Sequence, residues 1–192
     1  MLSPAQLQQL WDAGFVLVDP LFGSATVEIV RRAVQSLEVD ARSSRVRRGG
    51  PFAHRNLLEL NFVHELIADQ RIQAAVKAIA TDLVPVRAIL FDKNESANWT
   101  VPWHQDRAIA VREKIEFPGY GPWSVKSGVV HVQPPLEILE KMVTLRIHLD
   151  PCPEDNGPLR VIRGTHRQIL DETNVEDIVA HWSQTVCAIG AG

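Results

Sequence analysis

The chain has little cysteine, no long apolar run and no strong excess of one charge. Its two cysteines, Cys152 and Cys187, cannot build a disulfide framework, so we expect reduced thiols in a cytoplasmic protein. No apolar run approaches the roughly 20 residues that cross a bilayer, and no basic segment followed by an apolar one opens the chain. We therefore expect no membrane anchor and no signal peptide. A net charge of −3 gives no reason to expect a nucleic-acid partner.

The remaining composition is that of an ordinary soluble globular protein, with 45% hydrophobic and 22% charged residues. A length of 192 residues fits one domain, residues 1–192. One basic cluster stands before Gly49-Gly50-Pro51, and we predict a solvated loop there, with a lid that captures an anionic substrate as the alternative. The cluster consists of Arg42, Arg45, Arg47 and Arg48.

The front of the chain, residues 1–83, is predicted to be mainly helical. Ser3 is a good N-cap, followed by Pro4 at the first helical position and Gln6 to complete a capping box. Gly14 supplies the left-handed residue that ends this helix, and residues 15–18 then form a short buried strand. Further helices are predicted from residue 24, over 57–67 and over 72–79, from apolar residues at helical spacing.

The second part, residues 84–192, is predicted to be mainly β. We expect strands at 84–91, 142–149, 159–162 and 185–189, an extended segment at 99–106, a long connection at 107–135 and a helix at 175–182. Asp155-Asn156-Gly157 is a strong hairpin-turn signal. Helices first and strands afterwards favour an α+β, mainly β chain, with N-terminal helices packed on a jelly roll.

The chemistry is carried first by His104-Gln105-Asp106. On an extended segment residues i and i+2 point the same way, so His104 and Asp106 can reach one metal ion. Two histidines and one carboxylate form the facial triad that binds Fe(II) and leaves positions open for other ligands. A three-residue pattern alone is a weak signal, because it recurs by chance.

A wider pattern makes it specific. Trp103-His104-Gln105-Asp106, followed about fifty residues later by the run from Asp155 to Arg167, DNGPLRVIRGTHR, resembles the phytanoyl-CoA dioxygenase family. The capped first helix running into Gly14-Phe15-Val16-Leu17-Val18 is similar to that family too. The resemblance implies a double-stranded β-helix (cupin-like jelly roll), Fe(II) and 2-oxoglutarate as cofactors, and hydroxylation of a small organic substrate.

The sequence departs from the family pattern at its end. In the family a turn after the hairpin leads to a strand with the second histidine ligand, and the arginine that binds 2-oxoglutarate follows. Here the chain stops at Gly190-Ala191-Gly192. We therefore expect a C-terminally truncated jelly-roll core that lacks its last strands, the distal histidine and that arginine. Such a chain should have little or no activity, and its exposed strand edges should make it a homo-oligomer.

Other candidate binding residues follow from position. By the resemblance Gln105 neighbours 2-oxoglutarate. Arg146, on the alternating strand, needs an anionic partner, which is either a cosubstrate or substrate carboxylate or a structural acid. Lys93 is a further cofactor-binding candidate. The substrate candidates are His131 and Gln133 in the long connection, with a solvent-exposed loop as the alternative, and Trp103, with a core aromatic as the alternative.

The other histidines leave alternatives open. His148 shares a strand face with Arg146 and either lines the pocket or is a hydrogen-bonded core residue. By the resemblance His166 is structural, and His181, His54 and His64 are expected to have no functional role. Two other functions stand beside the oxygenase. One is a family member that has lost catalysis and binds a small molecule or a partner. The other is a cupin-type protein whose metal is held by His104, Asp106 and His148 or His166.

Overall fold

The computed structural model describes residues 2–37, 44–47, 50–92 and 101–192. Within these ranges the chain is α+β, with six α-helices and small antiparallel sheets. The helices are α1 (Pro4–Ala13), α2 (Ser24–Gln35), α3 (Asn61–Ala68), α4 (Gln70–Ile79), α5 (Leu136–Leu139) and α6 (Val175–His181). The strands are β1 (Ser44–Arg47), β2 (Gly50–His54), β3 (Leu90–Phe91), β4 (Ile109–Val111), β5 (Trp123–Lys126), β6 (Val129–Val132), β7 (Leu159–Ile162) and β8 (Gln184–Cys187).

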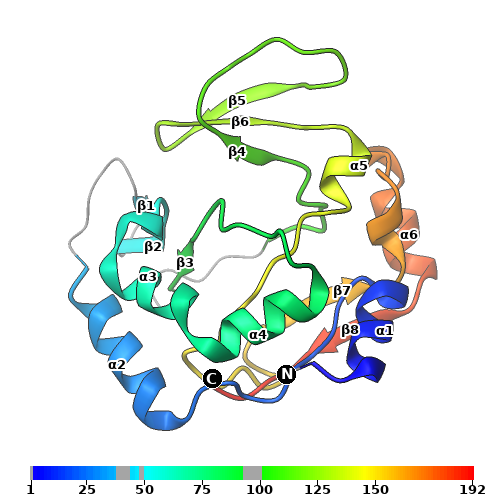
Figure 1. Ribbon diagram of the computed structural model, residues 1–192. Coiled ribbons are helices and arrows are strands. Elements are labelled where there is room, and N and C mark those ends of the chain that lie inside the picture. The colour runs from blue at the N-terminus through cyan, green and yellow to red at the C-terminus, as the bar shows by residue number, and fades with distance from the viewer. Residues whose placement is uncertain (1, 38–43, 48–49, 93–100) are drawn as a thin grey trace.

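The strands form three separate sheets, in the orders β1-β2-β3, β4-β6-β5 and β7-β8. The sheet of β4, β5 and β6 lies at one end of the molecule, and both chain termini lie at the opposite end (Figure 1). The sheet of β7 and β8 lies beside α1. Among the described residues no helix is long and apolar enough to cross a membrane.

The first helix begins and ends as predicted. The Ser3 hydroxyl accepts a hydrogen bond from the Gln6 amide at 3.2 Å, and the Gln6 side chain accepts one from the Ser3 amide at 2.9 Å. These two bonds satisfy amides that the helix itself leaves unpaired. Gly14 ends the helix with φ of 84°, and its amide donates to the Leu10 carbonyl.

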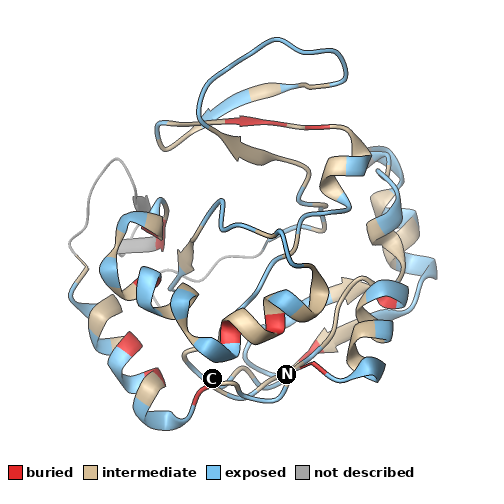
Figure 2. Ribbon diagram, in the orientation of Figure 1, coloured by how far each residue is buried: buried red, intermediate tan, exposed pale blue. Residues whose placement is uncertain are grey.

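The main apolar core joins α2 and α4. Val27 of α2, Ile72 of α4 and Phe22 are buried together, and the partly buried Ile147 and Leu149 pack against them. Figure 2 shows buried residues on α2 and α4 and, at the far end of the molecule, on β6. The core therefore brings the N-terminal helices against residues 147–149, as the alternating apolar residues of both segments predict.

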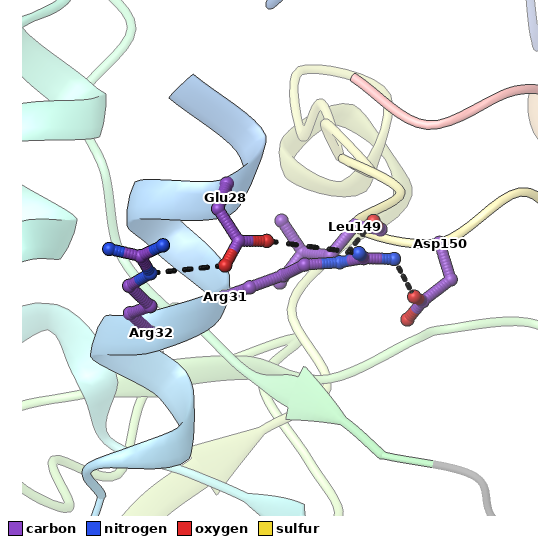
Figure 3. A network of polar contacts seen from close by, with 5 residues as sticks. All are labelled: Glu28, Arg31, Arg32, Leu149 and Asp150. Atoms are coloured by element: carbon purple, nitrogen blue, oxygen red, sulfur yellow. Dashed lines mark hydrogen bonds and ion pairs between the residues drawn. The ribbon is translucent and has the colours of Figure 1, made fainter. Parts of the chain in front are cut away.

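Polar contacts reinforce this junction (Figure 3). Arg31 of α2 donates from Nε to the Leu149 carbonyl at 3.0 Å and forms an ion pair with Asp150. The neighbouring Glu28–Arg32 pair, at 3.0 Å, stays within α2. Because Asp150 is exposed, its ion pair contributes little, and the bond to the backbone carbonyl is the more specific link.

Several predicted strands do not form. Residues 15–18 and 142–149 have no strand partner, and of 84–91 only Leu90–Phe91 pairs, with β2. Alternation of apolar and polar residues is a local property, whereas a strand needs a distant ladder partner. The 142–149 prediction was wrong for this reason: Arg146 and Leu145 are exposed, and only the 147–149 end is packed against the core.

The opposite error occurred in two predicted loops. The predicted connection at 107–135 contains β4, β5 and β6, with a tight turn at Ser127 and Gly128 between the last two. Both turn residues have positive φ, 52° and 78°, as in a type I′ hairpin. The basic cluster is not simply a loop either, because Arg45 and Arg47 lie in β1, which pairs with β2. Arg42 and Arg48 lie outside the described residues.

The C-terminal predictions are confirmed more closely. The Asp155-Asn156-Gly157 turn is followed by β7, α6 and β8. The partner of β7 is β8, with Leu159 opposite Cys187.

The turn that follows β7 is bound to the end of α1. The Gly164 amide donates to the Ala13 carbonyl at 2.9 Å, and the His166 Nε2–H donates to the Trp11 carbonyl at 3.1 Å. A second donor, Arg167 Nη2, reaches the same carbonyl at 2.5 Å. A Cβ at Gly14 would lie only 2.4 Å from His166 Nδ1. His166 therefore has the structural role that the resemblance implies.

This contact yields a prediction for Gly14→Ala. A left-handed alanine costs about 1–2 kcal/mol, and the clash with the His166 ring should add roughly 1–3 kcal/mol. Gly128→Ala is the matched control, since Gly128 also has positive φ but no atom within 4 Å of its added Cβ. Urea unfolding of both variants should show the larger loss for Gly14→Ala. Equal losses would show that His166 does not pack tightly on α1.

Candidate metal centre

The predicted metal ligands lie in a segment without regular structure, just before β4. His104 Nδ1 is 2.7 Å from the Pro102 carbonyl oxygen. A carbonyl can only accept, so Nδ1 carries the proton and the neutral ring presents a free lone pair at Nε2. That nitrogen is 4.0 Å from Asp106 Oδ1. The two side chains are 54% and 81% exposed, so solvent can reach both.

This donor pair suits a divalent transition metal. Metal–donor distances for histidine and carboxylate are about 2.0–2.2 Å, so two donors of one ion are at most roughly 4.4 Å apart. The 4.0 Å separation falls within that reach. Imidazole nitrogen with a carboxylate, and open positions beside them, is the set that non-haem Fe(II) prefers. His104 and Asp106 therefore fit the metal that the sequence predicts.

Gln105, between the two ligands, anchors this segment to the chain that follows β7. Its Nε2 donates to the carbonyls of Thr165 and Gln168, both at 2.9 Å. Its Oε1 accepts from the Leu170 amide at 2.8 Å. Both donor hydrogens and the acceptor are thus engaged, which gives Gln105 a positioning role. Its predicted place next to 2-oxoglutarate stays a prediction.

The predicted alternatives for a third ligand are not brought to this pair. Among the described residues, no group of three His, Cys, Asp or Glu side chains could hold one metal ion. His166 is bound to α1, and His181 lies on α6 with its Nδ1 bonded to the Asp177 carbonyl. His148 is half-buried, next to Arg146 rather than to Asp106.

Arg146, His148 and Cys187 form a second group of polar side chains. Burial lowers the pKa of His148, and the nearby Arg146 charge lowers it further. Burial raises the pKa of the Cys187 thiol, and the same Arg146 charge opposes that rise. Both cysteines are free. Among the residues described, no carboxylate forms an ion pair with Arg146, so a structural acid is not its partner there.

The predicted substrate residues lie in different environments. Trp103 is half-buried beside His104, and Gln133 is half-buried with its backbone bonded to Gly121 and Pro122. His131 is not in a loop: it lies in β6 and is only 3% exposed. Lys93 lies outside the described residues. The serine–glycine pair before β6 was the sequence signal that could have placed His131 in a hairpin.

A comparison with family models gives one match to most of the chain. The model described as phytanoyl-CoA dioxygenase (PhyH) matches residues 11–184. This range includes His104, Gln105, Asp106 and the turn that binds α1. Comparison with curated proteins gives no match.

Replacing Gln105 with leucine should release the contact between the two segments. The change removes three hydrogen bonds and leaves the Leu170 amide without its acceptor. We expect a loss of roughly 2–3 kcal/mol in unfolding free energy and faster hydrogen exchange at Leu170. Gln184→Leu is the control, because Gln184 makes a single side-chain bond, to the Val179 carbonyl. Unchanged exchange at Leu170 in Gln105→Leu would contradict the anchoring role.

Proposed function

Because the chain belongs to the phytanoyl-CoA dioxygenase family, we propose that it is an Fe(II)- and 2-oxoglutarate-dependent oxygenase that hydroxylates a small organic substrate. Members of this family are cupin-like jelly-roll proteins that use Fe(II) and 2-oxoglutarate, so an oxygenase-type function holds at the family level. We also propose that the small sheets are parts of one jelly-roll domain, with the N-terminal helices packed on it.

One observation carries the assignment of the metal site. The Pro102 carbonyl fixes the His104 tautomer so that Nε2, 4.0 Å from Asp106 Oδ1, is free to bind a metal. A hydrogen bond on the other ring nitrogen is the usual way in which a metal-binding histidine is oriented. Bound Fe(II) would supply, with 2-oxoglutarate and O₂, the oxidising power for hydroxylation of a C–H bond.

The remaining residues have supporting roles in this proposal. Gln105 holds the ligand segment on residues 165–170, so that His104 and Asp106 stay side by side. Arg146 is exposed, has no acidic partner among the described residues, and offers its guanidinium to a carboxylate of the cosubstrate or substrate. Trp103 forms a wall beside His104. Lys93 and Gln133 are retained as weaker binding candidates.

The third metal ligand sets the alternative. Because no third donor joins His104 and Asp106 in the part of the chain that the structure describes, a family member that has lost catalysis and binds a small molecule is the second candidate. The cupin-type alternative is less well supported, because the bond to Trp11 commits His166 to the fold. In either family reading a two-ligand site holds metal weakly.

Metal titration tests the assigned pair. His104→Ala and Asp106→Ala should each weaken Co(II) binding at least tenfold in calorimetry, because each removes one of two side-chain ligands. His181→Ala is the control, since His181 is an exposed histidine on α6. An affinity that falls in His181→Ala and not in His104→Ala would refute the site.

Turnover separates the two family readings. With Fe(II) in excess, succinate formation from 2-oxoglutarate should be slow in this chain, because only two side chains hold the metal, and it should vanish in His104→Ala. Metal binding without any succinate, across a panel of small organic acids and amides, would favour the member that has lost catalysis.

A further inference from the structure

The sheet of β4, β6 and β5 has one polar face. The register places His131 opposite Ala110 on one side and opposite Ser124 on the other. Directly opposed residues of antiparallel strands share a face, and so do residues i and i+2. Lys126, two residues after Ser124, is therefore on the same face as His131. This face belongs to none of the groups assigned above to the metal.

His131 is the unusual member of this face. It is only 3% exposed, and its Nδ1 is 2.9 Å from the Val129 carbonyl, to which it donates. Nε2 is then a buried acceptor, and it has no hydrogen-bond partner among the residues that the structure describes. Buried polar atoms are rarely left without a partner. The open lone pair calls for a hydroxyl or N–H group.

Positive charge surrounds this imidazole. Burial lowers the pKa of His131, and the charges of Lys126, Arg87 and Arg55 lower it further, against the hydrogen bond to Val129. No acidic group of the described chain acts on it. Lys126 and Arg87 form no ion pair within the described ranges, so both charges are available to an anion.

The three cations come from both sheets. Arg55 follows β2 and Arg87 precedes β3, whereas Lys126 ends β5. The Asn56 side chain donates to the Ser127 carbonyl at 3.1 Å, which ties the end of β2 to the turn between β5 and β6. The positive region is therefore held by two pieces of structure that contact each other.

The face is also close to the metal pair along the chain. Ala110, the partner of His131, is four residues after Asp106. Even a fully extended chain spans no more than about 3.6 Å per residue, so their Cα atoms are at most roughly 14 Å apart. A substrate of modest size can bridge that distance.

We propose that this face binds the acidic group of the substrate, and that the substrate is an organic acid with a hydroxyl or N–H group next to its carboxylate. Lys126 and Arg87 hold the carboxylate, and His131 Nε2 accepts the hydrogen bond from the neighbouring donor. The word substrate rests on the proposed function, whereas the binding itself does not.

Lactate and propionate are suitable probes, since they differ by one hydroxyl group. Titrated into the metal-free chain and followed by the ¹⁵N signals of the His131 ring, lactate should bind at least fivefold more tightly than propionate and shift Nε2 more than Nδ1. Lys126→Gln and Arg87→Gln should each weaken both acids at least threefold. Lys77→Gln is the control, because it removes an exposed lysine of α4.

His131→Asn should abolish the preference for lactate, because asparagine can keep the donor to Val129 but has no group at Nε2. Should this variant fail to fold, the Nε2 shift in the wild-type chain remains the deciding observation. Equal affinity for the two acids, or an equal effect of Lys77→Gln, would overturn the proposal. Displacement of lactate by 2-oxoglutarate would overturn it as well, by making this the cosubstrate's site.

The result is independent of the metal. A chain that binds lactate at His131 but no Co(II) at His104 and Asp106 supports this anion site and contradicts the proposed oxygenase. A chain that binds Co(II) but neither acid does the reverse.

Discussion

The hydrogen bonds of residues 164–170 are the constraint on which the rest of the arrangement depends. On one side this segment is fixed to the end of α1 through the Trp11 and Ala13 carbonyls. On the other it receives all three hydrogen bonds of the Gln105 side chain. The N-terminal helix, the hairpin turn and the metal-ligand segment are far apart in sequence, and this one segment holds them together. Close packing at Gly14 makes the first of these contacts possible.

How much could be predicted from the sequence depended on how local the determining interaction is. The cap of α1 and the Asp155-Asn156-Gly157 turn are set by neighbours within a few residues, and both were predicted. The strand predicted at 142–149 failed because alternation says nothing about whether a ladder partner exists. The hairpin of β5 and β6 was missed because a long connection rich in proline and glycine outweighed the short signal of Ser127 and Gly128.

The same division applies to the site. The His104 and Asp106 pair followed from residue types at fixed spacing, and their 4.0 Å separation agrees with that reading. The positioning role of Gln105 was not predictable, because its partners lie 60–65 residues away. Nor was the burial of His131, which depends on a sheet that the sequence did not indicate. Interactions between distant segments therefore decide which polar residues are available to ligands.

The central claim is that His104 and Asp106 bind one metal ion beside the segment that Gln105 anchors. Paramagnetic broadening by Mn(II) tests it most directly, because the effect falls steeply with distance from the ion. The account predicts that the amide signals of residues 104–106 and 165–170 broaden first at low Mn(II) concentration. Broadening centred instead on α6, around Asp177 and His181, would contradict it.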